Sequence, residues 1–361
     1  MPDKRSTTRT RTAKSPAAAT GPGATAAESA KSPAGATGPG ATAAGSAMGE
    51  PGTAAAATRP GAANVVTPRT RGAREPAPDG RLAVRKTYKL FIGGAFPRSE
   101  SGRTYQVRAA GDATVNVARA SRKDVRDAVA AARTAVAKWS GATAYNRGQV
   151  LYRVAEMLDG RAAQFAAEVE AAEQVGSAQA SALVDAAIDR WIWYAGWPDK
   201  VAQVAGGANP VAGPYFNFSV PEPAGVVGVV APPESSLLGL VSVVAPVIAT
   251  GNAAVVVASQ DRPLPAITLA EVLATSDVPG GVVNMLTGLR GELAPVLAGH
   301  MDVNAIDVTG VGHDGRAELE RLAAASVKRV FAAGEDWTAP PTPRRMLAFL
   351  ETKTVWHPMG M

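Results

Sequence analysis

The spacing of apolar residues predicts a short β-hairpin followed by a helical region. Two apolar runs, Tyr88–Gly94 and Ser101–Val107, have the length and the turn residues of a hairpin. Val125 and Val129 then follow Ser121 at helical spacing, and a serine in this position favours the start of a helix. The same period continues over three further segments, Gln149–Leu158, Ala162–Val175 and Ala178–Ala205. This part of the chain is therefore predicted to be mainly helical.

After these helices the pattern changes to alternating strands and helices. Tyr215–Val220 alternates between apolar and polar residues as a strand does. Five short apolar runs cover Ala224–Ala231, Ala253–Val257, Val282–Leu286, Asn304–Val308 and Val327–Ala332. Four helical segments separate them, over Leu237–Thr250, Pro265–Thr275, Gly291–Ala298 and Arg316–Ala325. Repeated strand–helix–strand units predict an α/β fold with a parallel sheet, which binds ligands beyond the carboxyl ends of its strands.

Residues 1–85 differ from the rest of the chain in composition and in charge. They are rich in Ala, Gly, Pro, Ser and Thr, and they hold 12 Lys and Arg against 5 Asp and Glu, whereas the remaining residues hold 25 against 26. Lys14–Ala30 and Lys31–Ala47 repeat one low-complexity pattern. Such a segment has too few large apolar side chains to offset the entropy of ordering, so we predict a disordered basic tail.

Three interpretations of this basic tail remain open. Its Lys and Arg residues can contact a polyanion without specificity, it can tether the chain to a larger assembly, or it is a solvated extension without a ligand. Because the positive charge belongs to residues 1–85, the predicted folded part is close to neutral. The sequence therefore indicates no specific nucleic-acid partner.

The composition excludes several kinds of chemistry. The chain contains no cysteine, which excludes disulfides, thiolate metal sites and a cysteine nucleophile. Its three histidines, His300, His313 and His357, are far apart in sequence, and no metal site is predicted. No apolar run reaches the roughly 20 residues that cross a bilayer, and no secretory signal is recognised at the N-terminus. We expect a soluble, cytoplasmic protein without a membrane partner.

One glycine-rich stretch is a candidate nucleotide-binding turn. Gly310, Gly312 and Gly315 form a G-x-G-x-x-G pattern between a predicted strand and a predicted helix. Glycines there allow the backbone to approach a pyrophosphate, which the helix amides can face. However, the pattern comes late in the run of strand–helix units, whereas the dinucleotide motif usually opens such a run. In a chain with 37 glycines, a chance match is the alternative to dinucleotide binding.

Five sequence segments resemble segments of the aldehyde dehydrogenase family and occur in the same order as in that family. They are Tyr88-Lys-Leu-Phe-Ile-Gly-Gly, Pro223-Ala-Gly-Val-Val-Gly-Val-Val, Ala249-Thr-Gly-Asn, Val278-Pro-Gly-Gly-Val-Val-Asn and Glu351-Thr-Lys-Thr-Val-Trp-His-Pro. The resemblance implies a coenzyme-binding domain over residues 86–335, with a helical N-terminal part and a Rossmann-type parallel sheet. It also implies NAD(P) as the cofactor, with Gly310, Gly312, Gly315 and Asp261 as candidate contacts.

The same resemblance implies two elements of oligomerisation. One is a hairpin at residues 209–221, and the other is a strand within residues 350–361, which in the family packs against a neighbouring subunit. The candidate interface residues on these two elements are Tyr215, Phe216, Phe218, Thr354, Val355 and Trp356. Both elements suggest that the chain assembles with another subunit.

The chain departs from the family pattern at positions that carry chemistry. Glu234 replaces the asparagine that stabilises the oxyanion in the family, and its negative charge would repel that oxygen. Ala258 stands at the lysine that contacts the coenzyme's ribose, and the acid beyond it survives only as Asp261. No acid precedes the glycine of Val330-Phe-Ala-Ala-Gly, where the family has its catalytic glutamate. These substitutions imply that NAD(P) binding is weak or lost.

The largest departure is the missing catalytic domain. In the family, this domain and its cysteine nucleophile lie before the C-terminal strand, whereas here a linker of residues 336–349 leads directly to that strand. Ser235 and Ser236, beside Glu234, are the candidates for a substitute nucleophile. No histidine is adjacent to activate either hydroxyl, and a role as helix N-cap explains the two serines better. A coenzyme domain without its catalytic domain is expected to expose apolar surface, which usually finds a partner.

Two hypotheses of function follow. The first is a pseudoenzyme, a structural or regulatory subunit in a hetero-oligomer with an active full-length aldehyde dehydrogenase, or one that associates with itself. The alternative is an NAD(P)-binding oxidoreductase of the family with residual or reassigned activity. The glycine-rich turn and Asp261 favour the second hypothesis, and Ala258 opposes it. Neither hypothesis assigns a catalytic residue.

Overall fold

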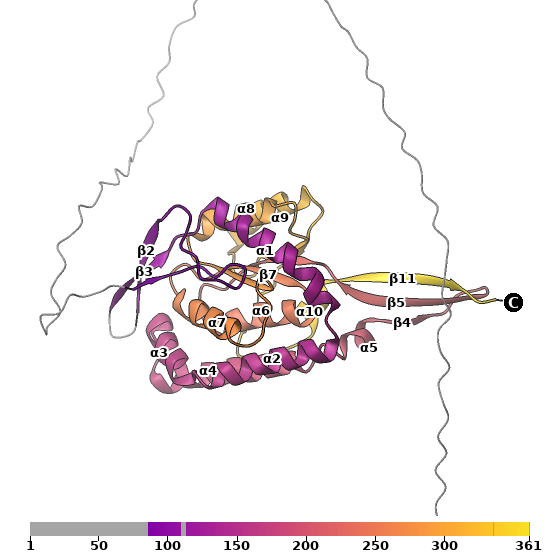
Figure 1. Cartoon of the computed structure of the whole chain (residues 1–361), viewed down its shortest axis with the longest axis horizontal. Helices are drawn as coiled ribbons and strands as arrows, with labels where there is room; N and C mark the ends of the chain where they lie inside the picture. Colours follow the sequence, from indigo (N-terminus) through magenta and orange to yellow (C-terminus); the bar gives the residue numbers. More distant parts are fainter. Residues whose placement is uncertain (1–85, 110–112, 335, 361) are drawn as a thin grey trace, which may run out of the picture. The chain divides into compact units, whose positions relative to one another are not determined.

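Three β-sheets organise the described part of the chain, which comprises residues 86–109, 113–334 and 336–360 of a computed structural model (Figure 1). The largest is a parallel sheet with helices on both of its faces. A three-stranded sheet lies at one end of the structure, and a second three-stranded sheet projects from the other end as an arm. The basic tail predicted over residues 1–85 lies outside the described residues.

The central sheet contains five parallel strands: β6 (Val226–Val230), β7 (Ala253–Val257), β8 (Val283–Leu286), β9 (Ala305–Asp307) and β10 (Arg329–Phe331). Their order across the sheet is β10-β9-β6-β7-β8. Every residue of β6 and β7 is buried, as expected of strands that helices cover on both faces. The prediction of an α/β fold with a Rossmann-type parallel sheet is confirmed.

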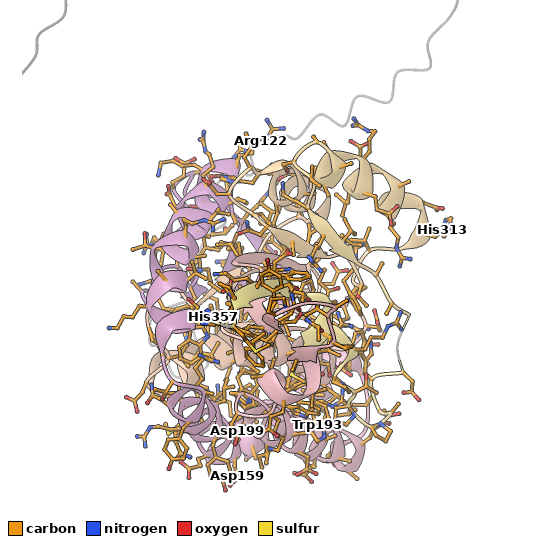
Figure 2. The ribbon with its side chains drawn as sticks, turned by 90° about the vertical axis from the view of Figure 1, so that its right-hand side faces the viewer. Arg122, Asp159, Trp193, Asp199, His313 and His357 are labelled. Carbon is orange, nitrogen blue, oxygen red and sulfur yellow. The ribbon has the colours of Figure 1, made fainter. Side chains whose placement is uncertain are left out.

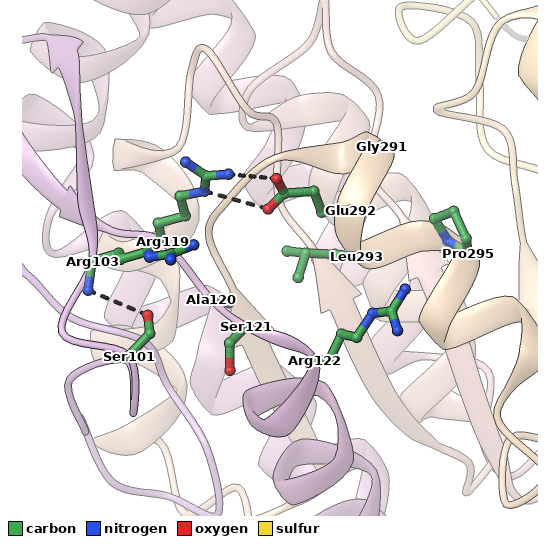
Figure 3. A pocket seen from close by; sticks show the side chains of 10 residues that line it. All are labelled: Ser101, Arg103, Arg119, Ala120, Ser121, Arg122, Gly291, Glu292, Leu293 and Pro295. Atoms are coloured by element: carbon green, nitrogen blue, oxygen red, sulfur yellow. Dashed lines mark hydrogen bonds and ion pairs between the residues drawn. The ribbon is translucent and has the colours of Figure 1, made fainter. Parts of the chain in front are cut away.

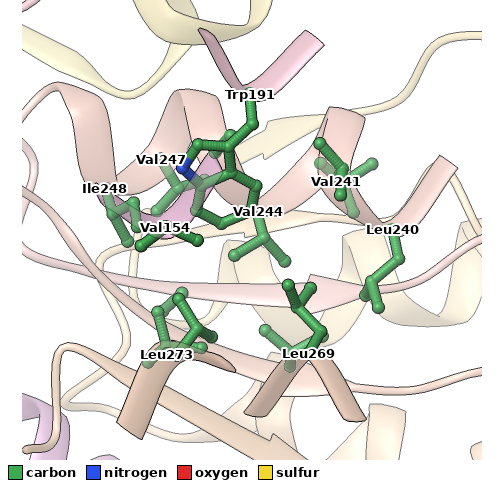
Figure 4. Close-up of a cluster of buried hydrophobic side chains, with 14 of the residues drawn as sticks. Val154, Trp191, Leu240, Val241, Val244, Val247, Ile248, Leu269 and Leu273 are labelled. Carbon is green, nitrogen blue, oxygen red and sulfur yellow. The ribbon is translucent and has the colours of Figure 1, made fainter. Parts of the chain in front are cut away.

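Two layers of helices cover the central sheet (Figure 1). One layer contains α1 (Arg122–Gly141), α8 (Arg290–Gly299) and α9 (His313–Ala324). The other contains α6 (Leu238–Ala249) and α7 (Leu264–Ala274), together with α2 (Ala144–Asp159), α3 (Ala162–Glu173) and α4 (Ser177–Ala195). Trp191 of α4 is fully buried against α6 beside Val244 and Val247 (Figure 4). Buried apolar clusters fill both faces of the sheet, one under this second layer and one under α1, α8 and α9.

The middle residue of β6 is a glycine because α8 lies directly against the strand. A Cβ at Gly228 would lie 2.8 Å from Cγ of Leu297 on α8, closer than such atoms approach one another. The missing side chain lets α8 come close to the centre of the sheet. The position of α8 matters because this helix borders both cavities that are described below.

The single helix predicted over Ala178–Ala205 is wrong, because residues 196–200 interrupt it. Helix α4 ends at Ala195 and Gly196 caps it. Pro198 follows, and a proline cannot donate the backbone hydrogen bond that a continuing helix needs. The chain then forms a separate short helix, α5 (Val201–Ala205).

The hairpin predicted between Tyr88–Gly94 and Ser101–Val107 is also wrong. Strand β2 (Thr104–Arg108) pairs antiparallel with β3 (Thr114–Ala118), and β1 (Thr87–Tyr88) lies parallel to β3. The rest of the first run is a loop whose Phe91 forms an isolated bridge with Met285 of β8. The alternation of Thr114-Val-Asn-Val-Ala marks the strand that the prediction missed.

The arm consists of β4 (Gly207–Asn209), β5 (Tyr215–Pro223) and β11 (Leu350–Pro358) (Figure 1). Strands β5 and β11 pair antiparallel along their whole length, and β4 pairs with the other edge of β5. The C-terminal strand of this chain therefore completes a sheet with the chain's own hairpin. A neighbouring subunit is not needed to pair with it.

Residues 336–349, here called the crossing segment, lead from β10 to the arm. They include the short helix α10 (Arg344–Ala348), which packs against α6 and β10. Trp337 is only 9% exposed, and Met346 and Phe349 are fully buried in the same core cluster as α6. The sequence predicts exposed apolar surface on the coenzyme domain, whereas on this side of the sheet the crossing segment covers it.

Two buried arginines hold the crossing segment in place. Arg345 of α10 forms an ion pair with Asp307 at the end of β9, and these side chains are 2% and 0% exposed. Arg190 of α4 donates hydrogen bonds to the backbone oxygens of Trp337 and Ala339, at 2.9 and 2.7 Å. Burial lowers the pKa of Arg345 to about 10, which reflects the cost of keeping its charge away from water.

Breaking this ion pair on one side is expected to destabilise the fold strongly. The variant Arg345→Ala leaves Asp307 buried without its countercharge and should lower the free energy of unfolding by about 3–5 kcal/mol. Replacing both residues, as Asp307→Leu with Arg345→Met, should restore most of the loss because an apolar pair of similar volume needs no countercharge. Urea unfolding followed by circular dichroism measures each value.

The control for this prediction is Arg329→Ala, which removes the exposed ion pair with Glu351. Its side chains are 44% and 53% exposed, so the expected loss is under about 1 kcal/mol. Equal losses at Arg329 and Arg345 would contradict the anchoring role of the buried pair.

Candidate functional site

The glycine-rich stretch leaves the carboxyl end of β9 and turns directly into α9. This helix begins at His313 with Gly312 as its N-cap, so Gly315 lies in the first turn of the helix and not in the loop. The helix was predicted to begin at Arg316 and starts three residues earlier. A Cβ at Gly310 would clash with the backbone of Ala231, which explains the first glycine by packing alone. Of the three glycines in this stretch, Gly312 alone faces open space, with no atom within 4 Å of where its Cβ would lie.

A slot with a volume of about 440 Å³ opens beside this turn, between α8 and α9. Ala294, Pro295, Val311 and Leu319 form its apolar walls. Gly312, His313 and Gly315 lie at the start of α9, where no side chain caps the helix, and free backbone N–H groups at such an end can bind an anion. Arg290 borders the same slot and donates a hydrogen bond of 2.8 Å to the backbone oxygen of Gly310. Asp314 and Glu318 also line the slot, so it combines apolar walls and the start of a helix with one arginine and two acids.

Asp261 lies apart from the residues that border this slot. Its side chain is exposed and faces Tyr105 of β2. Burial first, and the charge of Asp261 second, raise the pKa of the Tyr105 hydroxyl well above its usual range. Of the four candidate cofactor contacts, the structure brings Gly310, Gly312 and Gly315 together and leaves Asp261 outside.

Glu234 occupies the loop after β6, and its carboxylate is already engaged. The indole Nε1 of Trp337 donates a hydrogen bond of 2.9 Å to Oε1 of Glu234, and Arg262 donates to the backbone oxygen of Glu234. An ionised carboxylate accepts hydrogen bonds and donates none, so it offers no donor to a developing oxyanion. The crossing segment thus contacts Glu234 directly through Trp337.

The two serines beside Glu234 are held in structural contacts. Oγ of Ser235 accepts a hydrogen bond from the backbone N–H of Gly239 in the first turn of α6, as a capping residue does. Ser236 donates through Oγ to Glu173 of α3 at 2.7 Å. The N-cap of α6 is Leu237, so the predicted N-cap role of the two serines is wrong, although Ser235 still binds the first turn of the helix. Neither hydroxyl is arranged as an activated nucleophile.

The histidines do not complete a catalytic arrangement either. His313 begins α9 at the outer side of the domain, and His357 lies on β11 of the arm, well away from it (Figure 2). His300 caps the far end of α8. Among the described residues, no three His, Asp or Glu side chains gather as a metal site would require. No helix in that part of the chain is long and apolar enough to cross a membrane.

The candidate interface residues lie together on the arm but divide between its two faces. Opposite residues of antiparallel strands share a face and successive residues alternate, so the registers Phe218–Val355 and Ser219–Thr354 fix the division. Phe216, Phe218 and Val355 lie with Val220 on one face, here called the apolar face, which also carries His357 opposite Phe216 and Lys353 opposite Val220. Tyr215, Thr354 and Trp356 lie on the other face, where Asn209, Asn217, Ser219 and Thr354 form hydrogen bonds.

Sequence reasoning missed the residues that connect the crossing segment to the site. These are Arg190, Asp307, Trp337 and Arg345. Two signals could have found them. Asp307 interrupts an apolar strand, and Arg344-Arg345 ends a proline-rich stretch in which no helix was expected. An acid inside a buried strand requires a positive partner, and Arg345 supplies it.

Comparisons with known proteins agree with this architecture. The model of the aldehyde dehydrogenase family matches residues 98–334. Cytosolic aldehyde dehydrogenase 1 of Elephantulus edwardii is 32% identical over 263 residues, covering 71% of this chain and 51% of that protein. Cytosolic 10-formyltetrahydrofolate dehydrogenase of Mus musculus is 34% identical over 261 residues, which cover 69% of this chain and 28% of that protein.

Solved structures match over a similar extent. The NAD⁺ complex of aldehyde dehydrogenase from Bacillus cereus has a TM-score of 0.64 and 26% identity, covering 68% of this chain and 50% of that one. HpcC from Thermus thermophilus has a TM-score of 0.63 and 30% identity over 68% and 47% of the two chains. The chain therefore spans about half the length of these aldehyde dehydrogenases. From the family match and the fold together, the chain belongs to the aldehyde dehydrogenase family.

Proposed function

We propose that this chain is a non-catalytic member of its family that acts as a structural or regulatory subunit beside an active, full-length aldehyde dehydrogenase. The observation that carries the proposal is the apolar face of the arm. Phe216 is 48% exposed and Val220 is 37% exposed on this face, although both are large apolar side chains on a projecting sheet. Exposed apolar surface of this kind usually contacts another protein.

The chemistry around Glu234 supports the non-catalytic part of the proposal. The chain has no cysteine, and Ser235 and Ser236 are committed to other hydrogen bonds. By the family resemblance, Glu234 stands where the family has a hydrogen-bond donor to the oxyanion. Its carboxylate instead accepts a hydrogen bond from the indole N–H of Trp337. The reaction therefore lacks both an attacking atom and a group that stabilises the product of the attack.

A comparison of the two faces of the arm tests the proposal. The tagged chain is isolated from its native cells, and co-purifying proteins are identified and quantified by mass spectrometry. We expect a cysteine-containing aldehyde dehydrogenase in a fixed ratio, lost in Phe216→Ser with Val220→Ser because that variant makes the apolar face polar. The matched control is Tyr215→Ser, which removes an aromatic side chain from the opposite face and should keep the partner. A monodisperse monomer or a homo-oligomer without that partner contradicts the proposal.

The slot between α8 and α9 favours a second function, the binding of NAD(P) or of part of it. Its apolar walls suit a flat base and the start of α9 suits a phosphate, whereas Asp314 and Glu318 on the same wall repel a phosphate. Bound NAD(P) would supply hydride chemistry, for which this chain offers no nucleophile. Ala258 has no polar group for the ribose hydroxyls, and Asp261 lies apart from the slot, so we infer that binding is weak.

Titration calorimetry with NAD⁺ and NADP⁺ tests this second function. We expect weak binding, which the variant Gly312→Val abolishes because its side chain enters the slot. Gly176→Val is the matched control, since Gly176 is also an extended N-cap glycine with free space around its Cβ. If neither dinucleotide gives a heat of binding, the proposal is wrong. If both variants lose binding equally, the dinucleotide binds outside the slot.

A further inference from the structure

A second cavity, here called the basic cavity, lies between the start of α1, the start of α8 and the three-stranded sheet of β1, β2 and β3 (Figure 3). Its volume is about 520 Å³. It shares Gly291 and Pro295 with the slot, so the two cavities border neighbouring sides of α8. The glycine-rich turn does not contribute to it. Neither the family resemblance nor the proposed function assigns it a role.

Three arginines reach this cavity from different elements. Arg103 precedes β2, Arg119 follows β3, and Arg122 is the first residue of α1. The only acid on its wall is Glu292, whose carboxylate forms a two-pronged ion pair with Arg119. The wall therefore has a formal charge of +2. Within the described part of the chain, neither Arg103 nor Arg122 has a carboxylate in ion-pair range.

The backbone that carries these arginines is firmly held. Arg119 donates its N–H to the oxygen of Arg103, and Ala120 donates to Thr287 after β8. Ser121 caps α1 through a reciprocal pair of hydrogen bonds with Asp124. The positive groups therefore stand on rigid elements, and a ligand does not have to order a loop before it binds.

The walls also suit the organic part of a ligand. Ala120, Leu293 and Pro295 are apolar, and Ser101 adds a hydroxyl. A guanidinium group matches the geometry of phosphate oxygens, and positive charge in a concave site concentrates anions. A phosphate monoester carries close to two negative charges at neutral pH, which balances the net charge of the wall. The volume leaves room for the carbon skeleton that such an ester carries.

We propose that the basic cavity binds a small phosphate monoester independently of any nucleotide in the slot. Arg103 and Arg122 clasp the phosphate from two sides, and the organic part packs on Leu293 and Pro295. Glu292 competes for the charge of Arg119, so it limits the affinity for the anion.

Titration calorimetry of the full chain with glycerol 3-phosphate and with inorganic phosphate, against sodium chloride at equal ionic strength, tests the proposal. We expect saturable heat with the ester and weaker binding of phosphate alone. The variant Arg103→Ser with Arg122→Ser should weaken the binding at least about tenfold, because it removes both unpaired guanidinium groups. Glu292→Gln should strengthen it, because the change frees Arg119.

Two controls separate this site from others. Arg126→Ser removes an exposed arginine of α1 that does not line the cavity, and Gly312→Val fills the slot only. Both should leave the binding of the ester unchanged, and melting curves without ligand show whether each variant is folded. Absence of saturation with both probes overturns the proposal. An equally large loss of ester binding in Arg126→Ser also overturns it, because that result indicates non-specific attraction to positive charge. A loss of ester binding in Gly312→Val overturns it as well, because that result places the ester in the slot.

Discussion

The buried ion pair between Arg345 and Asp307 is the contact on which the second half of this structure depends. It fixes α10 against the end of β9, and α10 continues within two residues into β11 of the arm. The same anchoring brings Trp337 to Glu234 and buries Met346 and Phe349 beside α6. This contact, together with the hydrogen bonds that Arg190 donates, holds the segment that covers the sheet, reaches Glu234 and leads into the arm.

That covering changes the meaning of the substitutions around Glu234. The loss of a hydrogen-bond donor would by itself only impair a site. Here the carboxylate of Glu234 also accepts a hydrogen bond from the indole of Trp337 and so takes part in an internal contact. The crossing segment and Glu234 have become structural partners. In contrast, the slot beside α9 retains apolar walls and open space at Gly312. The crossing segment therefore occupies the region near Glu234, whereas the region near α9 is open.

The sequence alone predicts the regular parts well, because buried strands and amphipathic helices impose periods that a reader can count. All five strands of the central sheet, the cap at Ser121 and the structural contact of Ser235 agree with it. It fails where a short alternating run such as Thr114–Ala118 stands alone, and at Pro198, where one residue ends a helix. The contacts of Arg190, Trp337 and Arg345 depend on residues far apart along the chain, and no local pattern announces such pairings.

Gly228 has a consequence that reaches beyond the strand in which it lies. Helix α8 rests on the space that this glycine leaves, and the same helix forms a wall of both cavities. A side chain in the middle of β6 would meet Leu297, so that leucine or the helix that carries it would have to shift. The place of one wall of each cavity thus depends on a residue that lines neither of them.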